Sequence, residues 1–438
     1  MTFSVFRAMR IPGLLLFCVV AAFSSGFLQA AERPANGQTT EDARRVFEEV
    51  KTRVYQIRSL TIDGDAENSS GSGFLVGETG LIATNWHVVS GNVLEPGTYR
   101  LEALTTDKVR VPVRIVAVDS MNDLALLQAE GVTGVPLALR RTALEKGEKG
   151  FAIGNPRGVG FTVVEGNFNG VVSQAISGYF HFTAPMNAGM SGGPALTRDG
   201  EVFGVNVAKR TDSDSMGFLV PADRLAALIA RPRSEKPDND TLLEEARQGM
   251  IAGQNRVAES VLRPNPEMRQ IGQFRFPTGL ESTSRCRGST FKEEDDGYAV
   301  ESASCLTDLS IEAGRRHGVS LFWADYSVVR NLSLDGFRFA ARLSDLATKE
   351  KDDKGYRKVV GRYDCRTSHV RLHGGTARVT LCTRPYLKLE GLKDAHMRVV
   401  TIDSSEQALV GDLLLRGFTD ANIKRLSRWY LETIEWKR

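Results

Sequence analysis

The chain has 438 residues, of which 42% are hydrophobic and 25% are charged, and its formal net charge at pH 7 is +3. Removing residues 1–30, which hold two arginines and no acidic residue, lowers that net charge to +1. A nearly neutral chain of this kind gives no indication of a nucleic-acid partner or of a charged membrane surface as partner.

The first 30 residues have the pattern of a secretory signal peptide. Arg7 and Arg10 precede the apolar run IPGLLLFCVVAAF, and small residues follow near Ala30. The apolar run is too short for a comfortable membrane span. Cys18 lies inside it without a lipobox, which argues against a lipid anchor. We therefore expect an exported protein that keeps no stable membrane anchor after cleavage of residues 1–30.

The stretch TTEDARRVFEEVKTRVYQI predicts an amphipathic helix near the N-terminus of the exported part. Its apolar residues recur at helical spacing from Ala43 to Val54, behind a threonine cap. Farther on, Gly71 and Gly73 with the FLV run predict a hairpin, and LIATNWHVV then predicts a strand that ends at His87.

Three motifs carry the residue types of a nucleophilic catalyst: ATNWHVVSG around His87, VDSMNDLALL around Asp123 and NAGMSGGPAL around Ser191. A serine hydroxyl is a poor nucleophile at neutral pH, and it needs an imidazole to take its proton and a carboxylate to orient that imidazole. Asp123 lies in a predicted turn between two strand-like segments. Asp119, four residues earlier, is an alternative for the carboxylate.

In the order His, Asp, Ser, these motifs resemble the trypsin-like serine peptidases with the chymotrypsin fold, above all the bacterial Deg/HtrA group. The resemblance covers about residues 40–225 and includes FGVNVA and MGFLVPADRL after the serine motif. It implies a mainly β, double-barrel protease domain over 40–230. It also selects Asp123 over Asp119, because the family's aspartate is followed directly by Leu-Ala-aliphatic-Leu.

The resemblance also assigns the oxyanion hole and raises a question about it. The implied donors are the backbone amides of Gly189 and Ser191. In digestive relatives an aspartate before the nucleophile pairs with a newly cleaved N-terminus, and Deg-type enzymes usually have asparagine there. This chain has Met190 at that position. We therefore predict no activation by N-terminal cleavage, and the sequence leaves open whether the hole is preformed.

The predicted substrate-binding residues are Thr183, Pro185, Val207 and Lys209. Pro185 stands six residues before the nucleophile, where this fold commonly has the floor of its primary pocket, and proline supplies no charge to attract Lys or Arg. The expected preference is a small or medium apolar side chain before the cut. Lys209 supports an acidic side chain as the alternative.

Beyond about residue 230 the resemblance ends. RPRSEKPDND predicts a linker within residues 231–268, followed by a helix that starts at the capping box Thr241 to Glu244. Two similar segments then follow, at 269–350 and 351–438. Cys286 and Cys365 are 79 residues apart, Cys305 and Cys382 are 77 apart, and Phe337 and Phe418 are 81 apart. These offsets predict a tandem pair of small α+β repeat units.

The four cysteines of these units predict disulfides in an exported chain. A metal site is the alternative, but the wide spacing lacks the CxxC pattern of zinc sites, and His369 and His373 flank a Gly-Gly turn instead of sharing a helix face. The duplication favours local pairs, Cys286 with Cys305 and Cys365 with Cys382. We predict no metal and no cofactor.

The units do not resemble the PDZ modules that usually follow a Deg-type protease. Their position favours binding of a substrate or partner protein, and packing against the protease as a scaffold is the alternative. The predicted function is a periplasmic or secreted serine endopeptidase that hydrolyses protein or peptide substrates. The alternative is a catalytically weak protease-fold protein that binds other proteins, in a chaperone-like manner, through its C-terminal repeats.

Overall fold

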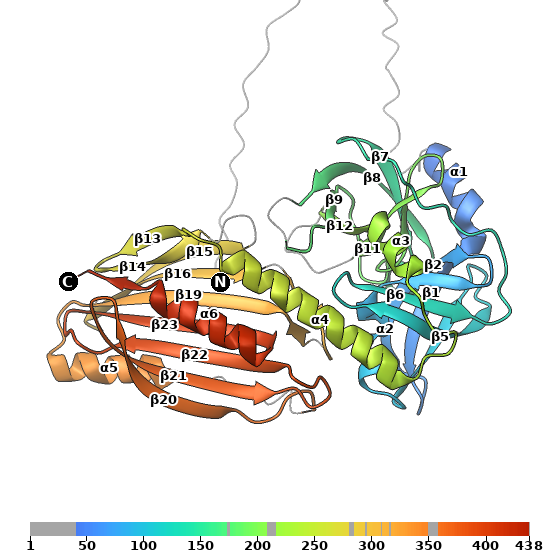
Figure 1. Cartoon of the computed structure of the whole chain (residues 1–438). Helices are drawn as coiled ribbons and strands as arrows, with labels where there is room; N and C mark the ends of the chain where they lie inside the picture. The colour runs from blue at the N-terminus through green and yellow to red at the C-terminus, as the bar shows by residue number, and fades with distance from the viewer. Residues whose placement is uncertain are drawn as a thin grey trace, which may run out of the picture. The chain divides into compact units, whose positions relative to one another are not determined.

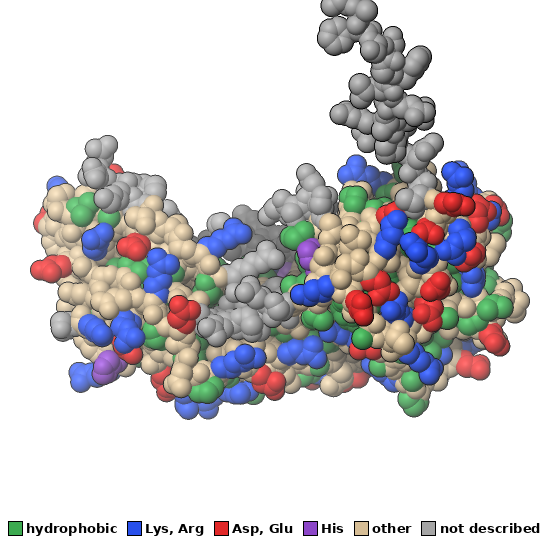
Figure 2. Space-filling model, turned by 90° about the horizontal axis from the view of Figure 1, so that it is seen from above, with side chains coloured by type: hydrophobic (Ala, Val, Ile, Leu, Met, Phe, Trp, Pro, Cys, Tyr) green, Lys and Arg blue, Asp and Glu red, His purple; other side chains and the backbone are tan. Residues whose placement is uncertain are grey.

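The computed structural model describes residues 41–172, 176–207, 216–279, 284–293, 296–307, 309–314, 317–348 and 358–437 (Figure 1). The predicted signal peptide lies outside the described residues. No helix in the described part is long and apolar enough to cross a membrane. Basic and acidic side chains are interspersed over the face in Figure 2, as the small net charge suggests.

The N-terminal helix is shorter than the sequence pattern predicts. Helix α1 spans Glu41–Val50, a single 3-10 turn follows at Lys51–Arg53, and strand β1 begins at Val54. Val54 therefore belongs to a sheet, although its spacing fits the helical pattern. The apolar side of α1 packs through Ala43, Val46 and Val50 on the barrel core.

Two closed six-stranded antiparallel barrels follow, and the predicted mainly β, double-barrel fold is confirmed. The first has the strand order β1-β2-β3-β6-β5-β4 and the second β10-β11-β12-β9-β8-β7. The first barrel's strands are β1 (Val54–Thr61), β2 (Glu67–Gly77), β3 (Leu81–Thr84), β4 (Tyr99–Leu104), β5 (Arg110–Asp119) and β6 (Leu124–Ala129). The second barrel's strands are β7 (Lys149–Gly154), β8 (Thr162–Val171), β9 (Phe180–Phe182), β10 (Pro194–Leu196), β11 (Val202–Val207) and β12 (Gly217–Pro221).

Short helical segments connect these strands. Helix α2 (Trp86–Leu94) follows β3, the 3-10 turn η2 (Pro156–Gly158) follows β7, and α3 (Ala222–Ala230) follows β12. Leu225 and Leu228 of α3 pack in the same apolar cluster as β6 and β11. This cluster joins residues of both barrels, so the two barrels share a continuous core.

The long helix α4 (Asn239–Val261) begins earlier than predicted. Its N-cap is Asp238, whose carboxylate accepts a hydrogen bond from the Thr241 amide at 2.8 Å. The prediction of a capping box from Thr241 to Glu244 is therefore wrong. In such a box the Glu244 carboxylate would accept from the Thr241 amide, but the Asp238 carboxylate takes that place. Glu244 instead pairs with Arg247 one turn later.

The C-terminal half builds one seven-stranded antiparallel sheet with the order β15-β16-β19-β23-β22-β21-β20. Strands from both predicted units pair at its centre, because β19 hydrogen-bonds to β23 from Leu321 opposite Arg416 to Arg330 opposite Gln407. The seven strands are β15 (Ser284–Glu293), β16 (Tyr298–Thr307), β19 (Leu321–Asn331), β20 (Asp364–Leu372), β21 (Gly375–Pro385), β22 (Lys393–Thr401) and β23 (Gln407–Phe418).

Two disulfides lie in this sheet, one in each outer hairpin. Cys286–Cys305 joins β15 to β16, and Cys365–Cys382 joins β20 to β21. In both cases the two cysteines are directly opposite each other in the strand register. Each disulfide therefore links neighbouring strands of one hairpin, as the repeated cysteine spacing suggests.

The two halves differ after their hairpins. The first half continues into the short pair β17 (Ile311–Glu312) and β18 (Gly318–Val319) and one long strand β19, whereas the second continues into β22 and β23. Helices α5 (Gly336–Thr348) and α6 (Asp420–Glu432) cover opposite faces of the sheet. Ala408 and Val410 of β23 pack with α5, and the alternate residues Leu409 and Leu413 belong to the cluster that includes α6.

A small three-stranded sheet of β13 (Glu267–Ile271), β14 (Phe274–Gly279) and β24 (Glu435–Trp436) completes the fold. Phe276 of this sheet stacks on Tyr326 of β19, and Phe274 stacks on Trp436. The main apolar cluster runs from the first barrel through α4 into the seven-stranded sheet. The first barrel and the C-terminal half are therefore joined by a shared hydrophobic core.

Candidate active site

His87 lies in the first turn of α2, three residues after the end of strand β3. Strand β3 stops at Thr84, Asn85 caps the helix, and Trp86 begins it. The prediction of a strand that reaches His87 is therefore wrong, because α2 begins before the histidine. Asn85 is fully buried and its side-chain amide donates to the Asp123 carbonyl at 2.7 Å.

Asp123 is held against His87 by two hydrogen bonds. Its Oδ2 is 2.8 Å from His87 Nδ1, and its Oδ1 accepts from the His87 backbone amide at 3.0 Å. Asp123 ends the turn between β5 and β6 with a φ of 56°, in the left-handed region. Only 10% of its side chain is exposed, so little water competes for this carboxylate.

Asp119 has a different set of partners. Its carboxylate accepts from the amide and the side chain of Asn122 and lies 3.5 Å from Arg231. It thus stabilises the turn that leads to Asp123. The structure places Asp123 against the imidazole and uses Asp119 to shape the same loop.

Ser191 lies in a glycine-rich loop before β10, and only 3% of its surface is exposed. Its carbonyl accepts from the Ser72 amide at 2.7 Å, which ties the loop to β2. Gly192 has a φ of 84°, and a Cβ there would lie 2.2 Å from the Ser72 carbonyl oxygen. The tight approach of the loop to β2 therefore requires glycine at this position.

Gly71 brings the histidine helix and the serine loop together. A Cβ on Gly71 would lie 2.6 Å from Val88, the residue after His87, and 2.9 Å from the Ser191 carbonyl oxygen. Any larger residue would push the two segments apart. The first glycine of the predicted hairpin thus has a direct role in assembling the site.

The peptide groups before Ser191 have defined orientations. The Ala188 carbonyl accepts from the Arg157 amide at 3.0 Å, and the Gly189 carbonyl accepts from the Ser72 hydroxyl at 2.7 Å. In a trans peptide the C=O and N–H point to opposite sides. The Gly189 amide therefore points away from Arg157.

Met190 is a core residue of the second barrel. Its side chain is 1% exposed and packs with Phe182, Ala195 and Phe203. Gly154 on β7 makes room for it, since a Cβ there would lie 2.6 Å from the Met190 Cα. The serine loop is thus anchored by apolar packing at the position where digestive relatives form an ion pair.

The predicted substrate-binding residues have different surroundings. Thr183 and Pro185 are exposed after β9, and the Thr183 hydroxyl contacts the Asn169 side-chain amide. Val207 is 1% exposed and packs within the barrel core. Lys209 lies outside the described residues.

The C-terminal half contacts both ends of α2, the helix that carries His87. The sequence indicated packing of this kind only as the alternative to partner binding. Next to His87, the Trp86 indole donates to the Glu312 carbonyl of β17 at 2.8 Å. At the other end of α2, the Lys388 ammonium donates to the Leu94 carbonyl at 2.6 Å.

Helix α4 holds the turn that carries Asp123. The Ser120 hydroxyl donates to the Ala246 carbonyl at 2.6 Å, and the Val118 amide donates to Glu245 at 2.9 Å. Gly249 allows this approach, because a Cβ there would lie 2.3 Å from Ser120 Oγ. The one sequence signal was this glycine in a helix interior, where glycine is unfavourable by about 1 kcal/mol relative to alanine.

Residues 71–205 match the family model of the trypsin-like peptidase domain. The chain contains a trypsin-like peptidase domain. Among curated relatives of this peptidase domain, serine protease HTRA1 of Xenopus tropicalis is 34% identical over 182 residues, which are 38% of this chain and 37% of that protein. Protease Do-like 1, chloroplastic, of Arabidopsis thaliana is 29% identical over 238 residues, 49% of this chain and 53% of that protein.

The chain is also similar to solved structures. The crystal structure of Deg5 has 28% identity and a TM-score of 0.37, and the match covers 43% of this chain and 91% of that one. The serine endoprotease from Yersinia pestis has 22% identity and a TM-score of 0.37, over 44% of this chain and 66% of that one. The chain spans 53% or less of the length of the two curated relatives described above.

Proposed function

We propose that the protein is an exported serine endopeptidase that cleaves protein or peptide substrates with Ser191 as nucleophile, His87 as general base and Asp123 as the residue that orients His87. The observation that carries the proposal is the pair of hydrogen bonds that the Asp123 carboxylate accepts from the ring and the backbone amide of His87, beside the loop of Ser191. The trypsin-like peptidase domain and its protease relatives support it.

The proposed reaction follows from these positions. The Asp123 carboxylate keeps the proton of His87 on Nδ1, which leaves Nε2 as the basic nitrogen. Nε2 takes the Ser191 hydroxyl proton as Oγ attacks the scissile carbonyl carbon. The tetrahedral intermediate collapses when the leaving amine takes that proton from His87. Water, activated by the same imidazole, then hydrolyses the acyl-serine ester and restores the enzyme.

We infer that the amides of Gly189 and Ser191 form the oxyanion hole in the free enzyme. The inference is supported by the Ala188 carbonyl, which accepts from the Arg157 amide, so that the Gly189 amide of the same peptide group points to the opposite side. The buried Met190 holds the loop in this arrangement. A preformed hole stabilises the developing oxyanion without a rearrangement of the loop, and one donor is worth about 2.7–4 kcal/mol.

Labelling with a fluorophosphonate tests this proposal directly. The probe phosphonylates a serine quickly only when the nucleophile, the base and the oxyanion hole act together. We expect rapid labelling of the mature protein, with the modified peptide mapped to Ser191. Slow labelling of native protein at the rate of heat-denatured protein would favour the binding or chaperone-like alternative.

Export is the part of the proposal that concerns location. It is supported by the two disulfides of the sheet and by the leader-like pattern of residues 1–30. Fractionation of the producing cell, with the mass of the mature N-terminus measured, tests it. A chain that retains residues 1–30 and stays in the cytosol with four free thiols would contradict it.

A further inference from the structure

Helix α2, which carries His87, is too short to hold its own ends. It has nine residues, and isolated helices shorter than about 12–15 residues are marginal in water. Its N-cap residue, Asn85, makes no side-chain cap hydrogen bond, because that side chain donates to the Asp123 carbonyl instead. The first barrel contributes a hydrogen bond from the Ser69 hydroxyl to the Val88 carbonyl. Contacts from outside the barrel add to this support at both ends of the helix.

The first contact of this kind is at the N-terminal end, beside His87. Trp86 is fully buried, and its indole donates to the Glu312 carbonyl of β17 at 2.8 Å. The β17–β18 hairpin is itself packed closely on α4, because a Cβ on Gly253 would lie 2.6 Å from Ile311 Cδ1. The first turn of α2 is therefore tied to a hairpin of the C-terminal half.

A buried polar network holds this hairpin in place. His317, at its turn, is fully buried, and its Nε2 lies 2.6 Å from the Tyr386 hydroxyl. That hydroxyl donates its one proton to Asp394 at 2.7 Å, so it accepts from the His317 ring. Asp394 is fully buried and also accepts from the Arg384 guanidinium. Burial, with the charge of Asp394, raises the pKa of Tyr386 well above its ordinary value, which keeps the hydroxyl protonated.

The second contact is at the C-terminal end of α2. Leu94 is the last residue of the helix, and its carbonyl accepts from the exposed Lys388 ammonium at 2.6 Å. Asn239 of α4 adds a hydrogen bond to the Val93 carbonyl at 3.2 Å. The last carbonyls of a helix lack partners within it, and a cation there also interacts favourably with the helix dipole.

One short segment of the C-terminal half contributes to both ends. Tyr386 and Lys388 lie in the connector, residues 386–392, which joins β21 to β22. Leu389 and Leu392 anchor the connector, since both are buried in the main apolar cluster. The connector therefore reaches the end of α2 directly, through Lys388, and the beginning of α2 through the β17–β18 hairpin.

We propose that the connector and the β17–β18 hairpin position His87 for catalysis, with Tyr386 and Lys388 as positioning residues. This rests on the proposed function of His87 as general base. Asp123 meets the ring and the backbone amide of His87 at once, at 2.8 and 3.0 Å, so a small shift of α2 weakens at least one of the two hydrogen bonds. A displacement of about 1 Å can lower a reaction rate by about 100-fold.

The proton between His87 Nδ1 and Asp123 gives a readout that does not depend on hydrolysis. Its low-field proton NMR signal in the mature chain is identified by its absence from His87→Ala. We expect Tyr386→Phe and Lys388→Met to broaden this signal through exchange with water. With an internally quenched casein-derived peptide, both should lower kcat by about tenfold and leave KM within about twofold. Lys388→Arg keeps a cationic donor and should restore the signal and kcat.

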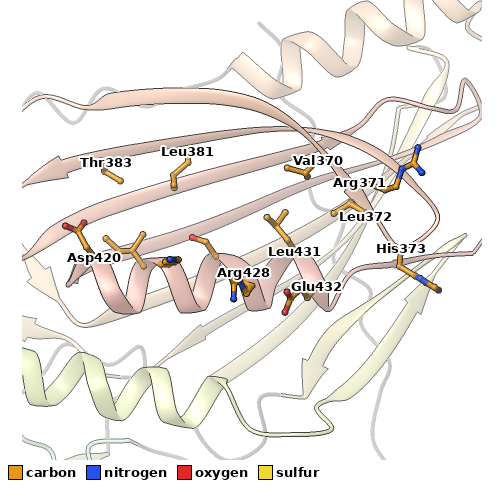
Figure 3. A pocket seen from close by; sticks show the side chains of 13 residues that line it. Val370, Arg371, Leu372, His373, Leu381, Thr383, Asp420, Arg428, Leu431 and Glu432 are labelled. Atoms are coloured by element: carbon orange, nitrogen blue, oxygen red, sulfur yellow. The ribbon is translucent and has the colours of Figure 1, made fainter.

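Two matched variants separate positioning from a general loss of stability. Tyr298→Phe also removes the hydroxyl of a buried tyrosine in the C-terminal half, but that hydroxyl accepts from Arg342 of α5 at 2.6 Å. Lys424→Met also removes an exposed lysine, which lines a pocket of about 790 Å³ between α6 and strands β20–β21 (Figure 3). The residues that line this pocket all belong to the C-terminal half. Both controls should keep the wild-type signal, kcat and KM.

An unchanged NMR signal in either Tyr386→Phe or Lys388→Met would overturn the proposal, and so would an unchanged kcat when the wild type is active. Equal losses in the two controls, or a wild type without the signal, would also overturn it. If the signal broadens as expected but the wild type cleaves no peptide, the positioning of His87 is supported and the proposed function is contradicted.

Discussion

At the residue scale, the candidate site depends on which of two neighbouring carboxylates faces the imidazole. Asp123 contacts both the ring and the amide of His87, whereas Asp119 stabilises the turn through Asn122. The two residues lie four positions apart on the same loop. Changing either aspartate to asparagine is therefore the same chemical change, made once at the carboxylate that contacts His87 and once at a carboxylate that does not.

Asp123→Asn is expected to lower kcat/KM by about 10⁴, because an amide stabilises the wrong tautomer of the histidine while preserving the shape of the site. Asp119→Asn keeps an acceptor for the Asn122 amide and should retain activity within about tenfold. Both are measured with an internally quenched casein-derived peptide. Equal losses in the two variants would show that Asp123 has no special part in the reaction.

Asp325 in the central strand β19 gives a prediction for pH. Burial raises its pKa to about 6, a hydrogen bond from Ser327 lowers it, and the charge of Asp412 raises it further. Asp412 lies directly opposite on β23. For Asp412 burial raises the pKa, but hydrogen bonds from His396 and Arg398 outweigh burial and leave the pKa below its ordinary value.

Because the pKa of Asp325 is higher in the folded than in the unfolded chain, the folded state binds the proton more tightly. Asp325 therefore contributes its full share to the free energy of unfolding below about pH 4. That contribution falls by about 2–3 kcal/mol as the pH rises to about 6. Asp325→Asn should remove this loss, so the variant gains stability over wild type between pH 4 and 7. Urea unfolding at several pH values measures it, and an unchanged difference across that range would contradict it.

At the element scale, the sequence predicted much of the fold because its signals are local. The N-terminal helix, the hairpin at Gly71 and Gly73 and the glycine-rich serine loop each have their pattern within a few residues. The start of α4 was misplaced because Asp238 and Thr241 both fit an N-cap, and only the folded geometry shows which one accepts the amide. Val54 fits the helical spacing of the residues before it, but it pairs with Phe74 and therefore belongs to strand β1.

The contacts of α4 and β17 with the catalytic segments could not be predicted, since they join residues far apart in the sequence. Ser120 meets Ala246, and Trp86 meets Glu312. No periodic pattern encodes such a pairing. Gly249 is the residue that makes the first of them possible, and it gives a direct test of whether α4 supports the site.

Gly249→Ala should lower activity and destabilise the fold by about 1–3 kcal/mol, because the new methyl group meets Ser120 Oγ at 2.3 Å. Gly336→Ala on α5 is the matched control, since a Cβ there meets nothing within 4 Å. In a helix that change should be neutral or stabilising by up to about 1 kcal/mol. Similar unfolding midpoints and similar kcat values in the two variants would refute a supporting role for α4.

The two disulfides should stabilise the sheet without affecting the barrels directly. They close segments with sequence separations of 19 and 17 residues, for which chain entropy gives about 3 kcal/mol each. Replacing Cys365 and Cys382 together by serine should lower the melting temperature, and peptide mapping without reductant should show two local pairs in the wild type. A peptide linking Cys286 to Cys365 would contradict this pairing.

In the molecule as a whole, the first barrel shares a hydrophobic core with α4 and the C-terminal half. The helix that carries His87 and the turn that carries Asp123 lie where these parts meet. The roles of the C-terminal strands and of substrate residues were the least predictable part. Val207 proved to be a core residue. The three motifs predicted the segments of the candidate site, but not the contacts of α4 and β17 that support them.

Hydrolysis of casein by the mature protein, compared with the Ser191→Ala variant on a gel, tests the central claim most directly. We expect the wild type to degrade casein and Ser191→Ala to leave it intact, with an unchanged circular dichroism spectrum, because removing one hydroxyl costs little packing. His87→Ala should lose nearly as much activity, since triad members act as a unit. Equal degradation by wild type and Ser191→Ala would contradict the account.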